Sequence, residues 1–596
     1  MQEVVSPCGG QIPKSMLLVG EKPLAANLFE ELFKMQEFFE RIIVVGADLK
    51  PYEEWMRFCL HDDFFKTKLS FVRSGDSASI NDDVWNVVEW ISETRHAPDL
   101  LIVRPEVFWT DLSFLMDEGK GSWQAYANGK ALPIWKLEGF ASIVNAMIKL
   151  DKAGKWSMAE LTAKLESEGK IGALDANGTM LPVDSPKDFH AAVKWRSSQK
   201  EGGAYVIEVD ESRQTVKVSN AWKAKKWTPT VHMSEREAQS RLWDCWDFLE
   251  SSSSLQRPYL QVPVNRGPNV RGQYCNWIEL QWIPDSSIEA IMLSRAMPEA
   301  EWRTIMDKAL DILEESFWQE QEADWRSDAD RKDRTRMVEE LSSYWDDLVK
   351  ERIPNFSAIK WQTVISRHVE WLEDHVRNRK AVFHNGTGGR LVHGDLSLKN
   401  ILCNWQTLDV HFVNPKNRTG ILVDAMSEYA SMYADCWCLL PVFVRGQHVD
   451  CGAEGLDVPD FIADNAAHLE GILDIRLGED AKEAKTEALM LALESMDEVP
   501  LEHRKAFLAF LHYRAEELYV GSSNVARRRD EIPAECIGLN EDAVFNCPKA
   551  SKGDIICSKT MFQHHHHPHH HPHHHPCSQT ETEQQEESQQ NQSQRP

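Results

Sequence analysis

The residues with the clearest capacity for chemistry lie between positions 392 and 402, in the string VHGDLSLKNIL. Asp395 is followed five positions later by Asn400, and apolar residues flank the pair on both sides. Phosphoryl transfer to an alcohol needs a carboxylate that orients the hydroxyl and accepts its proton, and oxygen ligands for the Mg²⁺ ion that neutralises the phosphates. Because one short loop supplies both, the string predicts phosphotransfer with Mg²⁺.

The HGD sequence of this loop resembles the aminoglycoside phosphotransferase and choline kinase superfamily, whose loop has HGD where protein kinases have HRD. The resemblance covers roughly residues 200 to 530. It implies a two-lobed fold like that of protein kinases, ATP as the phosphate donor, Asp395 as the catalytic base and Asn400 as a metal ligand.

Two later segments resemble further parts of this superfamily, the "IDPRG" metal segment and a "YDLAKL"-like helix. Residues 412–416 read FVNPK, and residues 433–440 read YADCWCLL, in which Asp435 is the implied structural carboxylate. Asn414 stands where the family has a metal-binding Asp. A neutral carboxamide keeps one oxygen ligand but loses the charge that holds Mg²⁺. A weakened enzyme and a pseudokinase are therefore both open.

For the small lobe, the resemblance implies a strand lysine on the ATP phosphates and a helix glutamate paired with it. Lys217 lies on an expected strand, and Glu237 lies on the helix that follows. Residues 277–284, WIELQWIP, resemble the family's "YxxMEYxP" hinge, whose backbone would hold adenine. This places Glu279 and Ile283 among the expected nucleotide-binding residues.

The first 17 residues include GGQIPKSML, which resembles the start of sugar-phosphate nucleotidyltransferases. In that family a glycine-rich loop cradles a triphosphate and a "PK" lysine, here Lys14, neutralises it. Glu106 stands where the family has the Asp of a strand ending in "GD", and Asp184 lies in a segment resembling "DTPED". The resemblance implies that Glu106 and Asp184 hold one Mg²⁺ ion for attack on the α-phosphate of an NTP.

Apolar patterning predicts the elements that must position these residues. Short apolar strands alternate with helical stretches in the first 195 residues, which favours an α/β, Rossmann-like domain with a largely parallel sheet. A strand-rich stretch and then a long helical stretch follow, as in a kinase. The expected strands are 15–19, 41–45, 100–103, 205–209, 215–219 and 277–282, and the expected helices are 24–39, 82–94, 234–250, 297–351 and 481–520.

The domain organisation that follows has four parts. Residues 1–195 are the nucleotidyltransferase-like α/β domain, 196–290 the kinase-like small lobe, and 291–530 the kinase-like helical lobe. Residues 531–596 form a tail rich in His and then in Gln and Glu, with almost nothing apolar near its end, so we expect it to be disordered.

Composition limits the classes of function. The chain has 596 residues and a net charge of −27, which argues against a general nucleic-acid binder. No apolar run approaches the ~18–20 residues that cross a bilayer, and the start does not read as a secretory signal. The 12 cysteines lack CxxC pairs, which is typical of reduced thiols in the cytoplasm. We therefore expect a cytoplasmic protein that binds neither membranes nor nucleic acids.

Together these features predict a bifunctional protein that activates a sugar or amino alcohol. One half would phosphorylate a small hydroxylated metabolite with ATP, and the other would couple a sugar phosphate or similar small phosphate to a nucleotide. A degenerate protein that keeps both folds and binds a nucleotide or ligand for regulation is the alternative. One active half beside one inactive half is the third possibility.

Overall fold

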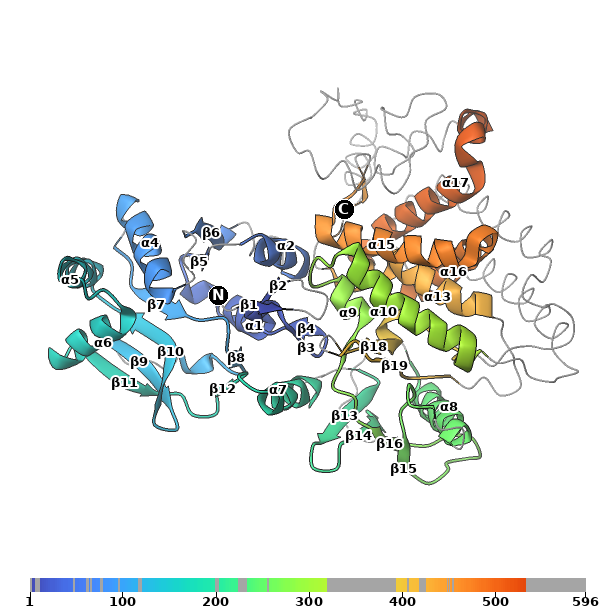
Figure 1. Cartoon of the computed structure of the whole chain (residues 1–596), viewed down its shortest axis with the longest axis horizontal. Coiled ribbons are helices and arrows are strands. Elements are labelled where there is room, and N and C mark those ends of the chain that lie inside the picture. Colours follow the sequence, from blue (N-terminus) through green and yellow to red (C-terminus); the bar gives the residue numbers. More distant parts are fainter. Residues whose placement is uncertain are drawn as a thin grey trace, which may run out of the picture.

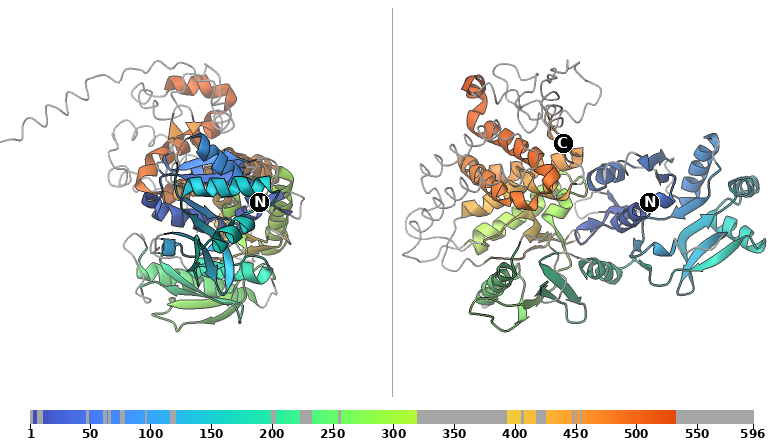
Figure 2. Two further views of the ribbon diagram at one scale, coloured as in Figure 1. Left: turned by 90° about the vertical axis from the view of Figure 1, so that its left-hand side faces the viewer. Right: turned by 180° about the vertical axis from the view of Figure 1, so that it is seen from behind.

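The computed structural model describes residues 3–5, 11–318 and 393–531, apart from short gaps inside the last two ranges. A mixed α/β region lies at one end of the molecule, and a bundle of helices lies at the other (Figure 1). A small antiparallel sheet with one helix lies below the bundle, and the view from behind shows the same arrangement (Figure 2). The predicted tail beyond residue 531 and the part of the helical lobe at 319–392 lie outside the described residues.

The main sheet of the N-terminal half is mixed rather than largely parallel, so that prediction was wrong. Its strand order is β11-β9-β10-β7, and only β11 and β9 run parallel. The reason is a hairpin between β9 and β10, whose turn residues Asn128 and Gly129 have φ angles of +52° and +75°. An Asn-Gly pair with both φ values positive makes the tight turn that joins antiparallel strands. The strands are β7 (Leu100–Val103), β9 (Ser122–Ala127), β10 (Lys130–Leu137) and β11 (Ile171–Asp175).

The expected strands at 41–45 and 100–103 are confirmed as β5 (Ile42–Gly46) and β7, and β5 pairs in parallel with β6 (Leu69–Arg73). The expected strand at 15–19 is instead a 3-10 turn, Lys14–Met16, followed by the short β3 (Leu18–Val19). The remaining elements of this half are β1 (Glu3–Val5), β2 (Gln11–Pro13), β4 (Lys22–Pro23), α1 (Ala26–Lys34), α2 (Lys50–Cys59), α4 (Ile80–Glu93), β8 (Phe108–Trp109), α5 (Phe140–Lys152), α6 (Met158–Ser167), β12 (Met180–Leu181) and α7 (Pro186–Ser198).

The second sheet is the antiparallel one expected for the small lobe, with strand order β13-β14-β16-β15. Alternation fixes its two faces. Val216 lies opposite Leu280 on β16, and both belong to the core that packs on α8, while Lys217 and Glu279 lie opposite each other on the other face. The elements are β13 (Tyr205–Asp210), β14 (Thr215–Asn220), α8 (Glu235–Ser253), β15 (Pro263–Arg266) and β16 (Trp277–Gln281).

A helical bundle follows the second sheet. A three-stranded sheet, β17-β18-β19, lies between that sheet and the bundle and carries the expected catalytic loop. The elements are β17 (Ser286–Ser287), α9 (Ile288–Met292), α10 (Glu299–Ile312), β18 (Ile401–Cys403), β19 (Val410–Phe412), α13 (Ala425–Cys436), α14 (Leu440–Arg445), β20 (Cys451–Gly452), β21 (Gly455–Leu456), α15 (Asp460–Leu477), α16 (Ala481–Glu494) and α17 (Leu501–Glu531).

One hydrophobic core crosses from the N-terminal half into the C-terminal half. Val19, Phe108 and Val193 belong to the same buried cluster as Trp282 and Ile288. The boundary expected at residue 195 falls inside helix α7. The end of the N-terminal half therefore packs as part of the core of the C-terminal half.

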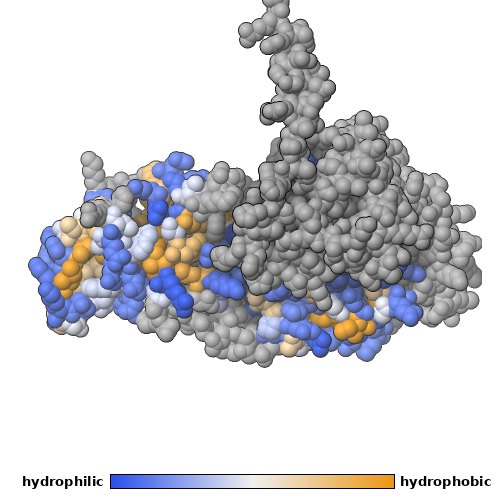
Figure 3. All heavy atoms as spheres, turned by 90° about the horizontal axis from the view of Figure 1, so that it is seen from above, coloured by the Kyte–Doolittle hydropathy of each residue, from blue (hydrophilic) through white to orange (hydrophobic). Residues whose placement is uncertain are grey.

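The surface mixes polar and apolar side chains, and Figure 3 shows hydrophilic residues around smaller hydrophobic groups on the described part of one face. Apart from Val262 and Val264, the large hydrophobic side chains that are exposed lie far apart in the sequence, at Phe38, Ile148, Ile475 and Leu501. In the described part of the chain, no helix is both long and apolar enough to cross a membrane.

Candidate functional site

The predicted catalytic loop is held together by its own polar side chains. The Nδ2 of Asn400 donates to the carbonyl oxygen of Asp395 at 2.7 Å, and the Nδ2 of Asn414 donates to the Oδ1 of Asn400 at 3.2 Å. The structure therefore brings Asp395, Asn400 and Asn414 together, although the β18–β19 hairpin lies between Asn400 and Asn414 in the sequence.

Steric contact explains why position 394 of this loop is a glycine. Gly394 has φ = +89°, and a Cβ atom there would lie 2.3 Å from the carbonyl oxygen of Lys416. Any side chain would push the loop off the segment that carries Asn414, so only glycine lets the two segments meet.

His393 is a buried neutral side chain that fixes the loop. Its Nδ1 accepts from the backbone N–H of Asp395 at 3.2 Å, so Nε2 carries the proton and donates to the carbonyl oxygen of Val413 at 2.6 Å. Burial lowers the pKa of His393 to about 4. The uncharged histidine therefore links the loop at Asp395 to the segment that follows β19.

Two buried carboxyl groups on α13 support the loop from below. Glu428 accepts hydrogen bonds from the backbone N–H groups of His393 and Gly394, and Asp435 accepts from the N–H of Leu398 at 2.7 Å. Burial raises the pKa of Glu428 to about 7, although the two N–H groups oppose the shift. Sequence reasoning selected Asp435 and missed Glu428. The signal was an acidic residue among apolar positions of a helix.

Positive side chains surround Asp395. The Nζ of Lys416 lies 3.5 Å from its Oδ2, and Lys399 and Arg241 lie close enough to act on its charge. Burial alone would raise the pKa of Asp395, but Lys416, Lys399 and Arg241 hold it below its usual range. The carboxylate is therefore charged at neutral pH. Lys399 and Lys416 lie in segments that the sequence analysis singled out, but only the structure shows that they and Arg241 surround Asp395.

The expected Mg²⁺ site does not fit the residues present. Mg²⁺ prefers carboxylate oxygens and phosphates, whereas Asn400 and Asn414 bring two neutral amides. One of their two oxygens, Oδ1 of Asn400, already accepts the Nδ2 of Asn414. The one carboxylate of the loop, on Asp395, is paired with Lys416. We therefore derive no chemical step through a metal ion here.

The structure does not bring Lys217 and Glu237 together, and among the described residues they form no ion pair. The Nζ of Lys217 lies 4.7 Å from the centroid of the Trp277 ring, and Glu279 pairs with Arg213 at 3.1 Å. The alternation of β14 is the reason, because it directs Lys217 away from the face that packs on α8.

The expected hinge residue Ile283 lies in the linker between β16 and β17 and is partly buried. Two serines next to it join this linker to the N-terminal half. Ser286 Oγ donates to the carbonyl oxygen of Gly20 at 2.5 Å, and Ser287 Oγ donates to a carboxylate oxygen of Glu21 at 2.6 Å.

The three expected residues of the N-terminal site are partly assembled. The Nζ of Lys14 lies 3.0 Å from Oδ1 of Asp184, whereas Glu106 pairs with the Nε of Arg104 at 3.2 Å. Pairing of Leu181 with Phe108 in the β8–β12 ribbon places Glu106 and Asp184 at one end of that ribbon. The described residues contain no group of three or more His, Cys, Asp or Glu side chains placed to hold a metal.

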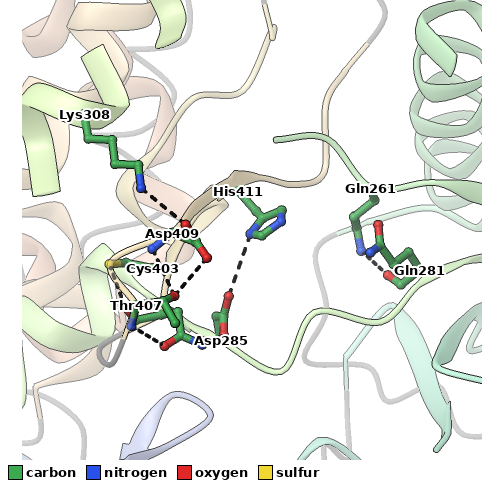
Figure 4. A network of polar contacts seen from close by, with 9 residues as sticks. Gln261, Gln281, Asp285, Lys308, Cys403, Thr407, Asp409 and His411 are labelled. Atoms are coloured by element: carbon green, nitrogen blue, oxygen red, sulfur yellow. Dashed lines mark hydrogen bonds and ion pairs between the residues drawn. The ribbon is translucent and has the colours of Figure 1, made fainter. Parts of the chain in front are cut away.

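A polar network lies beside the hinge (Figure 4). Asp285 accepts a hydrogen bond from Nδ2 of Asn404 at 3.1 Å and lies 3.8 Å from Nδ1 of His411. Burial raises the pKa of Asp285, and His411 and Asn404 oppose the shift. A few residues away, Asp409 pairs with Lys308 at 3.3 Å. Nothing in the sequence pattern singled out Asp285, which follows the hinge proline.

Comparisons with known proteins give likenesses to solved structures and no family. No family model matches the chain, and no curated protein matches it. One solved structure, a protein assigned as a glucose-1-phosphate thymidylyltransferase from Bacillus anthracis in complex with a sucrose, is 9% identical with a TM-score of 0.25, over 30% of this chain and 85% of its own. A glucosamine kinase in complex with glucosamine, ADP and inorganic phosphate is 14% identical with a TM-score of 0.27, over 60% of this chain and 86% of its own. At these TM-scores neither likeness carries an argument, so function is argued from the site.

Proposed function

We propose that the kinase-like half is a phosphotransferase that moves the γ-phosphate of ATP to a hydroxyl of a small sugar or amino alcohol. The observation that carries the proposal is the convergence of Asp395, Asn400 and Asn414 on a loop braced by Glu428 from below. A charged carboxylate held this rigidly among cations suits a general base that acts beside a phosphate.

In this mechanism the hydroxyl oxygen of the acceptor attacks the γ-phosphorus of ATP. Asp395 accepts the proton of that hydroxyl, and ADP leaves. The low pKa of Asp395 keeps the carboxylate charged before the reaction. Lys416, Lys399 and Arg241 supply positive charge for the phosphates, in the place where related chemistry uses a metal. Lys416 pairs with Asp395 in this structure, so ATP binding has to draw the ammonium towards the phosphates.

The proposal for the nucleotide site keeps Ile283 and replaces Lys217 with Arg241. Ile283 remains our candidate for the backbone contact with adenine, because it lies in the linker between the two lobes. Arg241 on α8 takes the place that sequence reasoning gave to Lys217, since its charge acts on Asp395. We assign Glu237 and Glu279 no contact with phosphate.

For the N-terminal half we propose nucleotidyl transfer to a sugar phosphate or similar small phosphate. Lys14 would neutralise a phosphate, and Asp184 and Glu106 would act near it. Support comes from the ion pair of Lys14 with Asp184 and from the shared ribbon end that holds Glu106.

A regulatory protein that binds nucleotide without turnover is the second candidate. Asn414 favours it, because the amide in this position removes the charge that would hold a catalytic metal. The pairing of Asp395 with Lys416 also favours it, since a lysine competes with the acceptor hydroxyl for the base.

The test is ADP release from ATP with a panel of sugars and amino alcohols, using the full chain and two variants. Asp395→Ala is expected to lower turnover by several orders of magnitude, whereas Asp409→Ala, at an exposed acid after β18, is expected to keep it. Normal turnover by Asp395→Ala would contradict the assignment. ATP binding without turnover by the wild type would favour the regulatory candidate.

A further inference from the structure

A cavity of about 460 Å³ lies where the N-terminal half meets the hinge of the kinase-like half. Its walls come from the start of the chain, from the beginning of α7 and from the hinge, and they include Lys14, Asp184 and Asp285. The volume lies within the range of sites that hold small metabolites. Segments that lie far apart in the sequence thus build one site.

One end of the cavity is suited to a single phosphate group. The side chain of Lys14 is 14% exposed and its partner Asp184 is 79% exposed, so the lysine is fixed while the aspartate is free to turn into solvent. Ser185 and Pro186, which follow Asp184 in the sequence, also line the cavity. The ammonium group of Lys14 favours an anion.

Another part of the lining is suited to hydroxyl groups. Asp285 is 9% exposed, and Asn404, which also lines the cavity, donates to it. Figure 4 shows the Asp285 side chain directed towards His411. A carboxylate and a carboxamide side by side are the groups that bind vicinal hydroxyls, because together they both accept and donate. His190 also lines the cavity.

Apolar side chains complete the lining. Leu17, Phe189 and Pro284 line the cavity, and they offer apolar surface to the carbon skeleton of a ring.

We infer that this cavity binds the phosphate ester of a small polyol, with its phosphate at Lys14 and its hydroxyls at Asp285 and Asn404. The inference rests on the cavity and on the sugar phosphate proposed as the acceptor of the N-terminal half, and it does not require turnover at Asp395. A phosphate ester of this class is also what phosphotransfer at Asp395 would produce. Because Asp285 belongs to the hinge, the ligand would contact both halves of the chain.

The test is titration calorimetry of the full chain, without nucleotide, with glucose 1-phosphate, glucose 6-phosphate and ribose 5-phosphate as separate probes. Glucose and inorganic phosphate are titrated in parallel. At least one sugar phosphate is expected to bind one site per chain, more tightly than either glucose or phosphate alone. Lys14→Ala is expected to weaken this binding about tenfold or more, through loss of a charge-assisted contact.

Matched variants separate this site from a general charge effect. Lys22→Ala removes an exposed lysine that pairs with Glu30 outside the cavity, and it is expected to bind as the wild type does. Asp285→Asn keeps the shape and is expected to weaken sugar phosphates while leaving inorganic phosphate unchanged.

Three results would overturn the inference. These are no binding of any of the three esters, equal binding by wild type and Lys14→Ala, or binding of inorganic phosphate as tight as that of the esters. None of these measurements uses ATP, so their failure is distinct from failure of the proposed phosphotransfer.

Discussion

The buried carboxyl of Glu428 gives a prediction that can be worked through in numbers. It accepts hydrogen bonds from the loop that carries Asp395 and is 2% exposed, and burial raises its pKa from 4.5 to about 7. A raised pKa means that the folded state prefers the protonated form. The stability that Glu428 contributes is therefore complete below pH 4.5 and is lost as the pH rises through about 7.

The size of the effect follows from the shift. Each pKa unit corresponds to about 1.4 kcal/mol, so a shift of this width is worth about 3 kcal/mol of unfolding free energy. His393 shifts in the opposite direction, since burial lowers its pKa from 6.5 to about 4. Its contribution is present above pH 6.5 and is lost as the pH falls through about 4. The two contributions nearly cancel in the wild type.

Glu428→Gln removes the pH-dependent contribution of Glu428 to stability and leaves that of His393, because glutamine mimics the protonated acid. Relative to wild type, the variant is expected to gain stability as the pH rises from 4.5 to 7, by about 3 kcal/mol in all. Imperfect hydrogen bonds from glutamine add a constant offset that does not change with pH.

The assay is denaturant unfolding of both proteins, followed by tryptophan fluorescence at several pH values across this window. A chain of 596 residues need not unfold in two states, so the midpoints of variant and wild type are compared at each pH. Glu299→Gln, at an exposed acid that pairs with Arg303, is the control and is expected to show a flat difference. A flat difference for Glu428→Gln would refute the reasoning.

Three further variants test other parts of the structure. Asn414→Asp suits a residue at φ = +54°, and it is expected to tighten Mg²⁺ binding with an ATP analogue about tenfold or more in calorimetry. Unchanged affinity would contradict the view that the missing charge at Asn414 is what keeps Mg²⁺ from this loop. Asn465→Leu leaves four buried backbone and indole partners unpaired, so a loss of at least about 3 kcal/mol is expected in denaturant unfolding. Arg196→Lys replaces a guanidinium that donates to three carbonyls and to Asn27, and a thermal midpoint equal to that of wild type would contradict the expected loss of about 2 kcal/mol or more.

Local patterns in the sequence predicted local structure well. The alternation at 205–219 predicted the hairpin of β13 and β14, and the helix expected at 234–250 is α8. These elements depend on neighbouring residues, so periodicity identifies them. Helix–strand alternation alone does not reveal the mixed sheet, whose antiparallel strands β9 and β10 are joined by the Asn128-Gly129 turn, a strong hairpin signal.

Spacing within one segment identified only part of the candidate site, and Asn414 and Asp435 came from the resemblance of two later segments to a known family. Asp395 and Asn400 lie on one loop, and their spacing identified them. Arg241, Lys416 and Glu428 reach the same place from three other segments, and no short pattern joins them. The role given to Lys217 depended on which face of β14 it lies on, which only the pairing with β16 settles.

The two serines that bind the hinge to Gly20 and Glu21, and the core that continues through α7, have a consequence for how such a chain can change over generations. Modules joined by a flexible linker can be exchanged by recombination, since few contacts cross the junction. Here a crossover near residue 195 would cut a helix and separate Val193 from its partners around Trp282. Selection therefore acts on the two halves together. A substitution in one half, where it packs against the other, limits which substitutions the other half can accept.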